Sequence, residues 1–246
     1  MSYRPDPRRF CVGGDFSRGI DTLFQWQPTV PDNGTWSAED AINGVCKLTP
    51  SDSSVADNDE IYLASQQEPF VFKAGCPIYA SCRMQFVEAN ADRANVIFGL
   101  MNAVAANSLI DDGGGPRASG SVCCIYKRET ERYWRTQGRD YWDVQDMESQ
   151  EPAGVISRVE SIDGVVTTTT PWQTLEMWIE DPRPPYTVKE RVMIATFAVD
   201  GRRLPVVHEL SIINATEMQL FVGVKNGSAV METLKVNWLY GEGVRD

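Results

Sequence analysis

ETLKVNWLY, residues 232–240, alternates between two kinds of side chain in the way that is typical of a half-buried β-strand. Every second residue from Leu234 to Tyr240 is apolar or aromatic. We expect these residues to face one side of a sheet and the residues between them to face the other. Residues 82–86 (CRMQF) and 173–180 (QTLEMWIE) alternate in the same manner. These segments predict strands with one face in a core and one face in solvent.

Other segments are apolar without interruption. NVIFGLM (95–101) and VMIATFAV (192–199) suit strands that are covered on both faces. Asn226-Gly227 predicts a hairpin between the apolar segments on either side of it. Helical periodicity is weak, and only SAEDAIN (37–43) and NAVAANSLID (102–111) are expected to form one or two turns. The pattern predicts an all-β fold, an antiparallel β-sandwich or jelly roll with minor short helices.

The chain is expected to divide into an N-terminal arm, residues 1–14, and a single β-sandwich domain, residues 15–246. The arm is predicted from its prolines and its paired glycines, which favour extended backbone. An arm that orders on contact would anchor a partner through its tyrosine and arginines, whereas a frayed terminus is the alternative. The predicted contact residues of the arm are Tyr3, Arg4, Arg8 and Arg9.

The charge balance limits the classes of partner. The chain has 34 acidic and 23 basic residues, a formal net charge of −11, which repels phosphate backbones and anionic membranes. No apolar run reaches the ~20 residues of a membrane-spanning helix, and the start of the chain does not look like a signal peptide. We expect neither nucleic acid nor a membrane as partner, and synthesis in the cytoplasm. The six cysteines are then expected to be reduced and mostly buried.

The glycine-rich stretch SLIDDGGGPRASGSV (108–122) is not a phosphate-binding loop. A phosphate loop needs a lysine and a hydroxyl residue directly after its last glycine, whereas Gly115 is followed by Pro116 and Arg117. Asp111 and Asp112 would also repel a phosphate. The glycines are expected to allow positive φ in a long connection between two strands.

No catalytic or metal-binding residue is predicted. Two carboxylate pairs, Glu129/Glu131 and Glu176/Glu180, could in principle serve a glycosidase, but the polar outer face of a strand or loop explains them better. His208 lacks the neighbours of a metalloprotease or a serine hydrolase and is expected to be structural. Neither of two acidic clusters, one of Asp52, Asp57, Asp59 and Glu60 and one of Asp111 and Asp112, follows a calcium-loop pattern, so no metal or other cofactor is expected.

One segment, RYWRTQGRDYW (132–142), gathers aromatic residues among arginines. Packing in the core is the preferred interpretation, and a protein interface or ligand stacking are the alternatives. The aromatic residues concerned are Tyr133, Trp134, Tyr141 and Trp142.

Four segments resemble a known family. Residues 59–86 (DEIYLASQQEPFVFKAGCPIYASCRMQF) resemble strands of a concanavalin A-like (laminin-G-like) jelly roll. NVIFGLMNAVAANSLIDDGGGPRASGSVCCIYK (95–127) and LFVGVKNGSAVMETLKVNWLYGEGVR (220–245) are similar to segments of tailed-phage virion proteins with that fold. FAVDGRRL (197–204) fits a hairpin of the same domains, while 128–170 has no counterpart.

The resemblance implies a non-enzymatic virion protein, a head decoration or cement protein. It would bind the major capsid protein on the outer capsid surface as a homo-oligomer, with a trimer favoured, after synthesis in the host cytoplasm. The alternative on the same fold is a carbohydrate-binding (lectin-like) or tail-associated receptor-binding module. A glycan-cleaving enzyme is the third and least favoured hypothesis.

Overall fold

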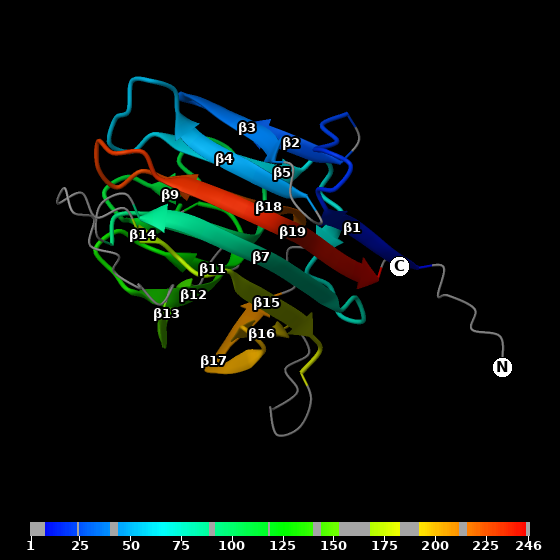
Figure 1. The fold of residues 1–246 in the computed structure, drawn as a ribbon. Coiled ribbons are helices and arrows are strands. Elements are labelled where there is room, and N and C mark those ends of the chain that lie inside the picture. The colour runs from blue at the N-terminus through cyan, green and yellow to red at the C-terminus, as the bar shows by residue number, and fades with distance from the viewer. Residues whose placement is uncertain are drawn as a thin grey trace.

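The computed structural model describes residues 8–23, 25–39, 44–88, 92–117, 119–139, 144–152, 168–182, 192–211 and 216–244. These residues form two large antiparallel sheets that pack face to face (Figure 1). None of them belongs to a helix of the length and apolarity that crossing a membrane requires. The all-β sandwich predicted from the sequence is confirmed.

The first sheet has nine strands, and its central path is β17-β16-β15-β7-β19-β4-β3, with β1 paired to β19 and β14 paired to β7. Figure 1 shows β4, β19, β7 and β15 side by side. The bounds are β1 (Arg9–Asp15), β3 (Asn33–Glu39), β4 (Val45–Ser51), β7 (Ile78–Glu88), β14 (Thr168–Thr169), β15 (Gln173–Glu180), β16 (Val192–Val199), β17 (Arg202–Ser211) and β19 (Thr233–Val244).

The second sheet has eight strands in the order β13-β12-β11-β8-β18-β5-β2, with β6 paired to β18. A separate two-stranded ribbon, β9 (Leu109–Ile110) and β10 (Gly115–Pro116), lies in the connection between β8 and β11. The bounds are β2 (Trp26–Thr29), β5 (Glu60–Ser65), β6 (Phe70–Val71), β8 (Asn95–Met101), β11 (Val122–Lys127), β12 (Tyr133–Arg139), β13 (Val144–Pro152) and β18 (Glu217–Lys225).

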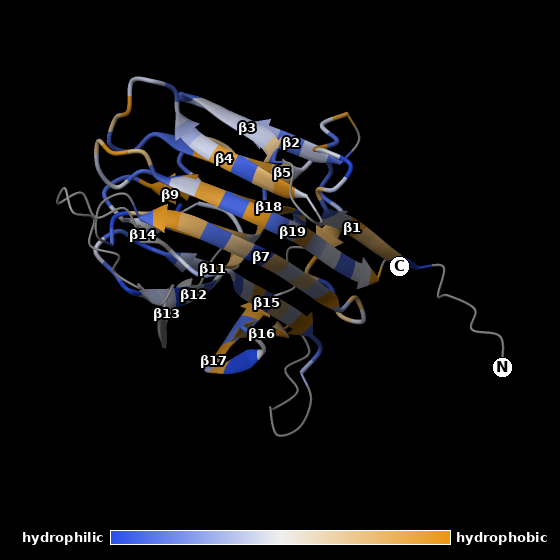
Figure 2. Cartoon of the chain, viewed as in Figure 1, coloured by the Kyte–Doolittle hydropathy of each residue, from blue (hydrophilic) through white to orange (hydrophobic). Residues whose placement is uncertain are grey.

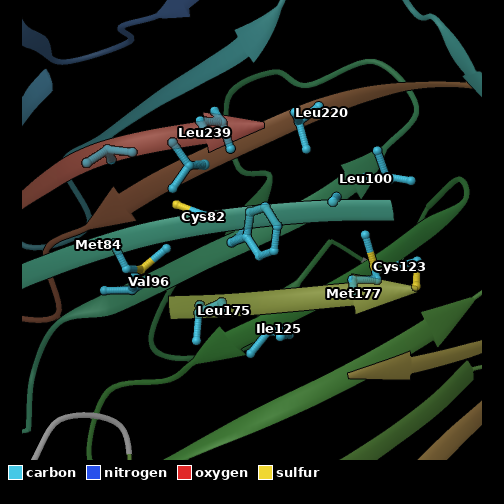
Figure 3. Close-up of a cluster of buried hydrophobic side chains, with 14 of the residues drawn as sticks. Cys82, Met84, Val96, Leu100, Cys123, Ile125, Leu175, Met177, Leu220 and Leu239 are labelled. Carbon is cyan, nitrogen blue, oxygen red and sulfur yellow. The ribbon is translucent and has the colours of Figure 1, made fainter. Parts of the chain in front are cut away.

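The main core lies between the two sheets. Leu175, Met177 and Ile179 of β15 are buried there, as the alternation in 173–180 predicts. Figure 3 shows side chains from both sheets pointing toward one another, among them Cys82 and Cys123. The hydropathy colours alternate along β7, β19 and β15 because only one face of each strand is in the core (Figure 2). The core therefore follows directly from the period-2 pattern.

Strand β19 departs from the prediction halfway along its length. Leu234 and Val236 face the core as expected, but the register against β7 shifts between Val236 and Trp238. Asn237 is the extra residue of this bulge, and its Nδ2 donates a hydrogen bond to the Gly44 carbonyl over 2.9 Å. A one-residue slip moves all later side chains to the opposite face. The prediction that Trp238 and Tyr240 share the face of Leu234 is therefore wrong.

The second sheet also has apolar side chains on its outer face. Tyr62, Tyr126 and Phe221 form a second buried cluster there, beneath Leu109 of the connecting segment 102–121. We call residues 102–121 the glycine-rich segment and the surface beneath them the covered face. Gly113 and Gly115 have φ of +69° and +79°, as expected for a connection between strands.

Four further predictions need correction. Residues 102–108 form turns and not a helix, and 37–39 belong to β3. Asn226-Gly227 does not close a hairpin, because β18 and β19 lie in different sheets and the connection crosses between them. Residues 9–14 of the predicted arm belong to β1, where Phe10 and Val12 pack against the core. The burial of these two alternating apolar side chains favours a strand here despite the paired glycines.

Candidate functional site

The outer face of the nine-stranded sheet carries half-buried and exposed aromatic and charged side chains on β7, β15 and β19. Strand register arranges them, with Asp15 of β1, in three rows across the strands: Trp178–Tyr79–Glu242, Glu176–Ser81–Tyr240 and Arg83–Trp238–Asp15. We call the surface formed by these nine residues the aromatic face.

The aromatic rings of this face contact one another. The Tyr79 ring centroid lies 5.4 Å from that of Trp178 and 6.4 Å from that of Tyr240, with tilted planes. The Arg203 guanidinium of β17 lies 4.3 Å from the Trp178 ring centroid, and its Nη1 donates to Thr196 Oγ1 over 2.9 Å. These contacts hold three rings side by side at the surface.

Carboxylates accept hydrogen bonds from the tyrosines of the aromatic face. The Tyr79 hydroxyl donates to Glu176 Oε1 over 2.9 Å, and the Tyr240 hydroxyl donates to Glu242 Oε2 over 2.8 Å. Partial burial, followed by the hydrogen bond to Glu242, raises the pKa of Tyr240 to about 12. Both tyrosines therefore stay neutral at physiological pH and keep their hydroxyl donors.

Arg83 lies at the other end of the face. Its guanidinium carbon is 5.4 Å from the Trp172 ring centroid and 5.5 Å from that of Trp238. Its Nη1 donates one long hydrogen bond, 3.3 Å, to Asn237 Oδ1. The bulge residue of β19 thus also positions Arg83.

Two surface hollows, each of about 480 Å³, open onto the aromatic face. The first is lined by Tyr79 and Trp178 together with Arg9, Glu180 and Glu242. The second has the following polar and aromatic lining residues: Asp15, Tyr79, Ser81, Arg83, Asn237, Trp238 and Tyr240. Tyr79 belongs to both hollows, so they adjoin at this ring. Tyr79 and Arg83 are four residues apart on β7, about 13 Å at the usual rise per residue of a strand.

Of the residues predicted from the arm and from the aromatic segment, the structure describes Arg8, Arg9, Tyr133 and Trp134. Arg8 and Arg9 are exposed, and Arg9 lies beside the first hollow. Trp134 is fully buried between the sheets, where its ring meets Phe86 edge-on at 6.0 Å. Tyr133 is 43% exposed. Tyr3, Arg4, Tyr141 and Trp142 lie outside the described residues.

The two carboxylate pairs considered above for a glycosidase, Glu176/Glu180 and Glu129/Glu131, do not form a close acid–base pair. Glu176 and Glu180 share the outer face of β15 but are four residues apart, about 13 Å along a strand. Two-carboxylate glycosidases need separations of about 5–9.5 Å. Glu131 binds Arg128 and Arg135, with nitrogen–oxygen distances of 2.6 and 2.7 Å. These acids are engaged in the structure of the strand surface and loops.

His208 and the acidic loops have structural surroundings. His208 is buried, with Nε2 2.9 Å from Thr136 Oγ1 and its ring edge-on to Phe197. Asp59 Oδ2 accepts the backbone N–H of Ala56 over 2.7 Å. Over the described ranges, no three His, Cys, Asp or Glu side chains are grouped so that they could hold a metal ion.

The sequence carries part of the signal for the aromatic face. The alternation in 82–86 and 173–180 places Arg83, Glu176 and Trp178 on outer faces, where the structure has them. It gives no sign that Trp238 and Tyr240 join them, because the bulge at Asn237 depends on pairing with a distant strand.

No family model matches this chain, and neither does any curated protein sequence. Solved structures do match. The carbohydrate recognition domain of Emp47p is 11% identical and aligns over 94% of this chain and 93% of its own, with a TM-score of 0.54. An endo-1,3-β-glucanase from Streptomyces sioyaensis is 14% identical over 100% of both chains, with a TM-score of 0.56.

The binding domain of botulinum neurotoxin DC is also similar. It is 7% identical and aligns over 94% of this chain and 47% of its own, with a TM-score of 0.51. At these identities the likenesses show the fold alone. The fold is the concanavalin A-like jelly roll, which the sequence resemblance implied.

Proposed function

We propose that this chain is a non-catalytic carbohydrate-binding protein whose ligand lies along the aromatic face. The observation that carries the proposal is the set of three contacting rings, Tyr79, Trp178 and Tyr240, at the meeting point of two hollows. A sugar ring has apolar C–H faces that stack on aromatic rings and hydroxyl edges that hydrogen-bond to charged groups. The aromatic face offers both kinds of group in the trough that its two adjoining hollows form from Arg83 to Trp178.

The geometry favours an oligosaccharide over a single sugar. The trough extends about 13 Å along β7, from Arg83 to Tyr79, and ring-bearing residues occur at both ends. Strands hold the side chains, so the site is largely preorganised and little ordering of the chain opposes binding. The concanavalin A-like fold, which the carbohydrate recognition domain of Emp47p also has, is compatible with this function.

A titration of the purified chain with a panel of neutral and acidic oligosaccharides tests the proposal. Trp178→Thr keeps a strand-forming residue on β15 and is expected to weaken binding at least tenfold, because truncating a central aromatic residue costs about 2 kcal/mol or more. Trp36→Thr is the matched control, since Trp36 is a 39% exposed tryptophan of β3 in the same sheet. The absence of binding to every panel member at millimolar sugar would contradict the proposal.

The proposal includes the absence of glycosidase activity. The backbone separation of Glu176 and Glu180 along β15, about 13 Å, supports it, because the carboxyl groups of a glycosidase pair lie about 5–9.5 Å apart. Release of reducing sugar from any bound oligosaccharide, lost in Glu176→Gln, would show that the chain is an enzyme.

A virion decoration protein remains the second candidate, on the strength of the segments 95–127 and 220–245 that resemble tailed-phage proteins. It would bind the major capsid protein on the outer capsid surface as a homo-oligomer, with a trimer favoured. Arg8 and Arg9 are exposed, at and just before the start of β1, and would be the residues that make such a contact. Co-sedimentation with capsids, compared between the full chain and Arg8→Ala/Arg9→Ala, tests this candidate. Full-length chain that stays in the supernatant would count against it.

A further inference from the structure

Arg83 has hydrogen-bonding capacity that the described residues do not use. A guanidinium has five N–H donors, and Arg83 donates a single long hydrogen bond, to Asn237. No carboxylate in the described ranges lies within ion-pair distance of it, whereas Arg128, Arg132 and Arg135 each bind one. Arg83 is half-buried, and the rings of Trp172 and Trp238 hold its guanidinium in place.

The nearest acid of the same hollow is occupied elsewhere. Asp15 lies opposite Trp238, but its Oδ1 accepts the backbone N–H of Ser17 over 3.0 Å and the Ser17 hydroxyl over 2.5 Å. The hydrogen bonds from Ser17 lower the pKa of Asp15, so its charge persists at neutral pH. Asp15 therefore does not form an ion pair with Arg83. Its negative charge nevertheless limits how many further negative charges the hollow accepts.

The two ends of the aromatic face differ in charge. Around Tyr79 and Trp178 there are three carboxylates, Glu176, Glu180 and Glu242, and two arginines, Arg9 and Arg203, so negative charge is in excess by one. Arg83 lies about 13 Å away at the other end. A second carboxylate on the ligand, placed over Tyr79, would meet this excess of negative charge, a repulsion that solvent weakens.

We infer that the ligand is a glycan with a single carboxylate-bearing sugar, whose carboxylate is bound by Arg83 while neutral sugars lie over Tyr79 and Trp178. A carboxylate matches the planar fork of a guanidinium in two parallel hydrogen bonds. The inference rests on the proposed function and specifies its ligand class. A polymer of uronic acids fits less well, because its further carboxylates would lie beside the glutamates and a body of net charge −11.

The test compares matched pairs of sugars by calorimetric titration: 3′-sialyllactose against lactose, and xylotriose carrying one glucuronic acid against xylotriose. The acidic member of at least one pair is expected to bind about tenfold more tightly or better, since hydrogen bonds between two charged groups are stronger than those between neutral groups. The pair that shows the difference identifies the acid as a sialic or a uronic acid. Trigalacturonate is expected to bind more weakly than the preferred acidic sugar.

Arg83→Gln is expected to abolish the preference, so that the acidic and the neutral member of each pair bind with affinities within about twofold of one another. Arg203→Gln is the matched control, because Arg203 also lies over a tryptophan of the face but donates to Thr196 and is exposed. It should retain the preference. Thermal unfolding of both variants verifies that they fold, and the wild-type comparison stands even if a variant does not.

The outcomes separate the inference from the proposed function. Equal affinity of the wild type for acidic and neutral members, with binding lost in Trp178→Thr, would overturn the inference and leave the function. Tightest binding of trigalacturonate, or an unchanged preference in Arg83→Gln, would also overturn the inference. Lack of binding to all the sugars would remove both.

Discussion

The outer faces of the two sheets differ in what covers them. On the nine-stranded sheet, outward side chains of β7, β15 and β19 meet solvent. On the eight-stranded sheet, the outward side chains of that sheet's own strands lie beneath the glycine-rich segment. The two faces differ first in composition. Trp178 of β15 alternates with core residues and has glutamates two positions away on either side, but Ile97 and Phe221 sit within continuous apolar runs. A strand that is apolar without interruption must be buried on both faces, and in this chain the glycine-rich segment buries the outer one.

The polar contacts of the two faces differ as well. The Lys225 ammonium of β18, on the covered face, binds Glu60 Oε2 over 3.2 Å, Asn107 Oδ1 over 2.9 Å, the Leu109 carbonyl over 2.9 Å and the Asp111 carboxylate. These bonds join β18 and β5 to the glycine-rich segment. On the aromatic face, Arg83 has no comparable set within the described residues. The covered face thus uses its charges for folding, and the aromatic face leaves an arginine available for a ligand.

The largest effect is expected for Lys225→Met. The side chains of Lys225 and Glu60 are 1% and 3% exposed, so the variant leaves a buried carboxylate without its cation. The free energy of unfolding should fall by about 3–5 kcal/mol. Urea unfolding measures it, with Lys235→Met as control: Lys235 binds Glu39 over 2.7 Å at the surface, a pair worth about 0–1 kcal/mol. Equal losses in the two variants would contradict the role given to the covered face.

The next effect is expected for Tyr62→Phe. The Tyr62 hydroxyl, on the covered face, donates to Glu60 Oε2 over 2.5 Å and accepts the backbone N–H of Leu109 over 2.8 Å. Its removal leaves a buried N–H unpaired and should cost about 1–3 kcal/mol. Tyr79→Phe, which removes a hydroxyl from the aromatic face, should cost less in the same urea titration. The opposite order would mean that the glycine-rich segment does not depend on this bond.

Alkaline pH should reveal the contribution of Tyr62 to stability. Burial, and then the charge of Glu60, raise the pKa of Tyr62 well above its ordinary value of 10.0. The folded state then keeps a proton that the unfolded chain releases, so this stabilisation is complete below about pH 10 and declines as the pH rises further. Plotted against pH between 9 and 11, the free energy of unfolding should fall less steeply in Tyr62→Phe than in the wild type. Parallel curves would contradict this assignment.

The smallest effect on stability is expected for Trp178→Thr. Trp178 lies on the open side of β15 and contacts Tyr79 and Arg203, so the loss in free energy of unfolding should be about 1 kcal/mol or less. Thermal unfolding measures it on the protein used for sugar titration. A loss as large as that of Lys225→Met would show that the aromatic face serves folding and not binding.

The fold was largely predictable because burial acts on local patterns. Residues 173–180 and 82–86 alternate, and their apolar members are in the core as expected. Residues 95–101 were expected to be covered on both faces and are. The short helix predicted at 102–111 was wrong, because the apolar side chain of Leu109 is buried over the second sheet instead of forming a helical stripe.

The candidate site was predictable only in part. The sequence placed Trp178, Glu176 and Arg83 on outer faces, and it drew attention to the segment 132–142, in which Trp134 is a core residue. The choice between core and surface for a tryptophan depends on which sheet face the strand presents. That choice is made by pairing with strands far away in the sequence.

By itself, the sequence determined a two-layer sandwich, because side chains of a strand alternate at a period of two whatever their partners are. Tertiary structure alone decided that Trp238 and Tyr240 face solvent beside Tyr79, since the bulge at Asn237 forms only against β7 and through the bond to Gly44. It also decided which outer face the glycine-rich segment covers, because the buried charge of Lys225 is stable only where oxygens of β5 and of the glycine-rich segment, two separate parts of the chain, surround it.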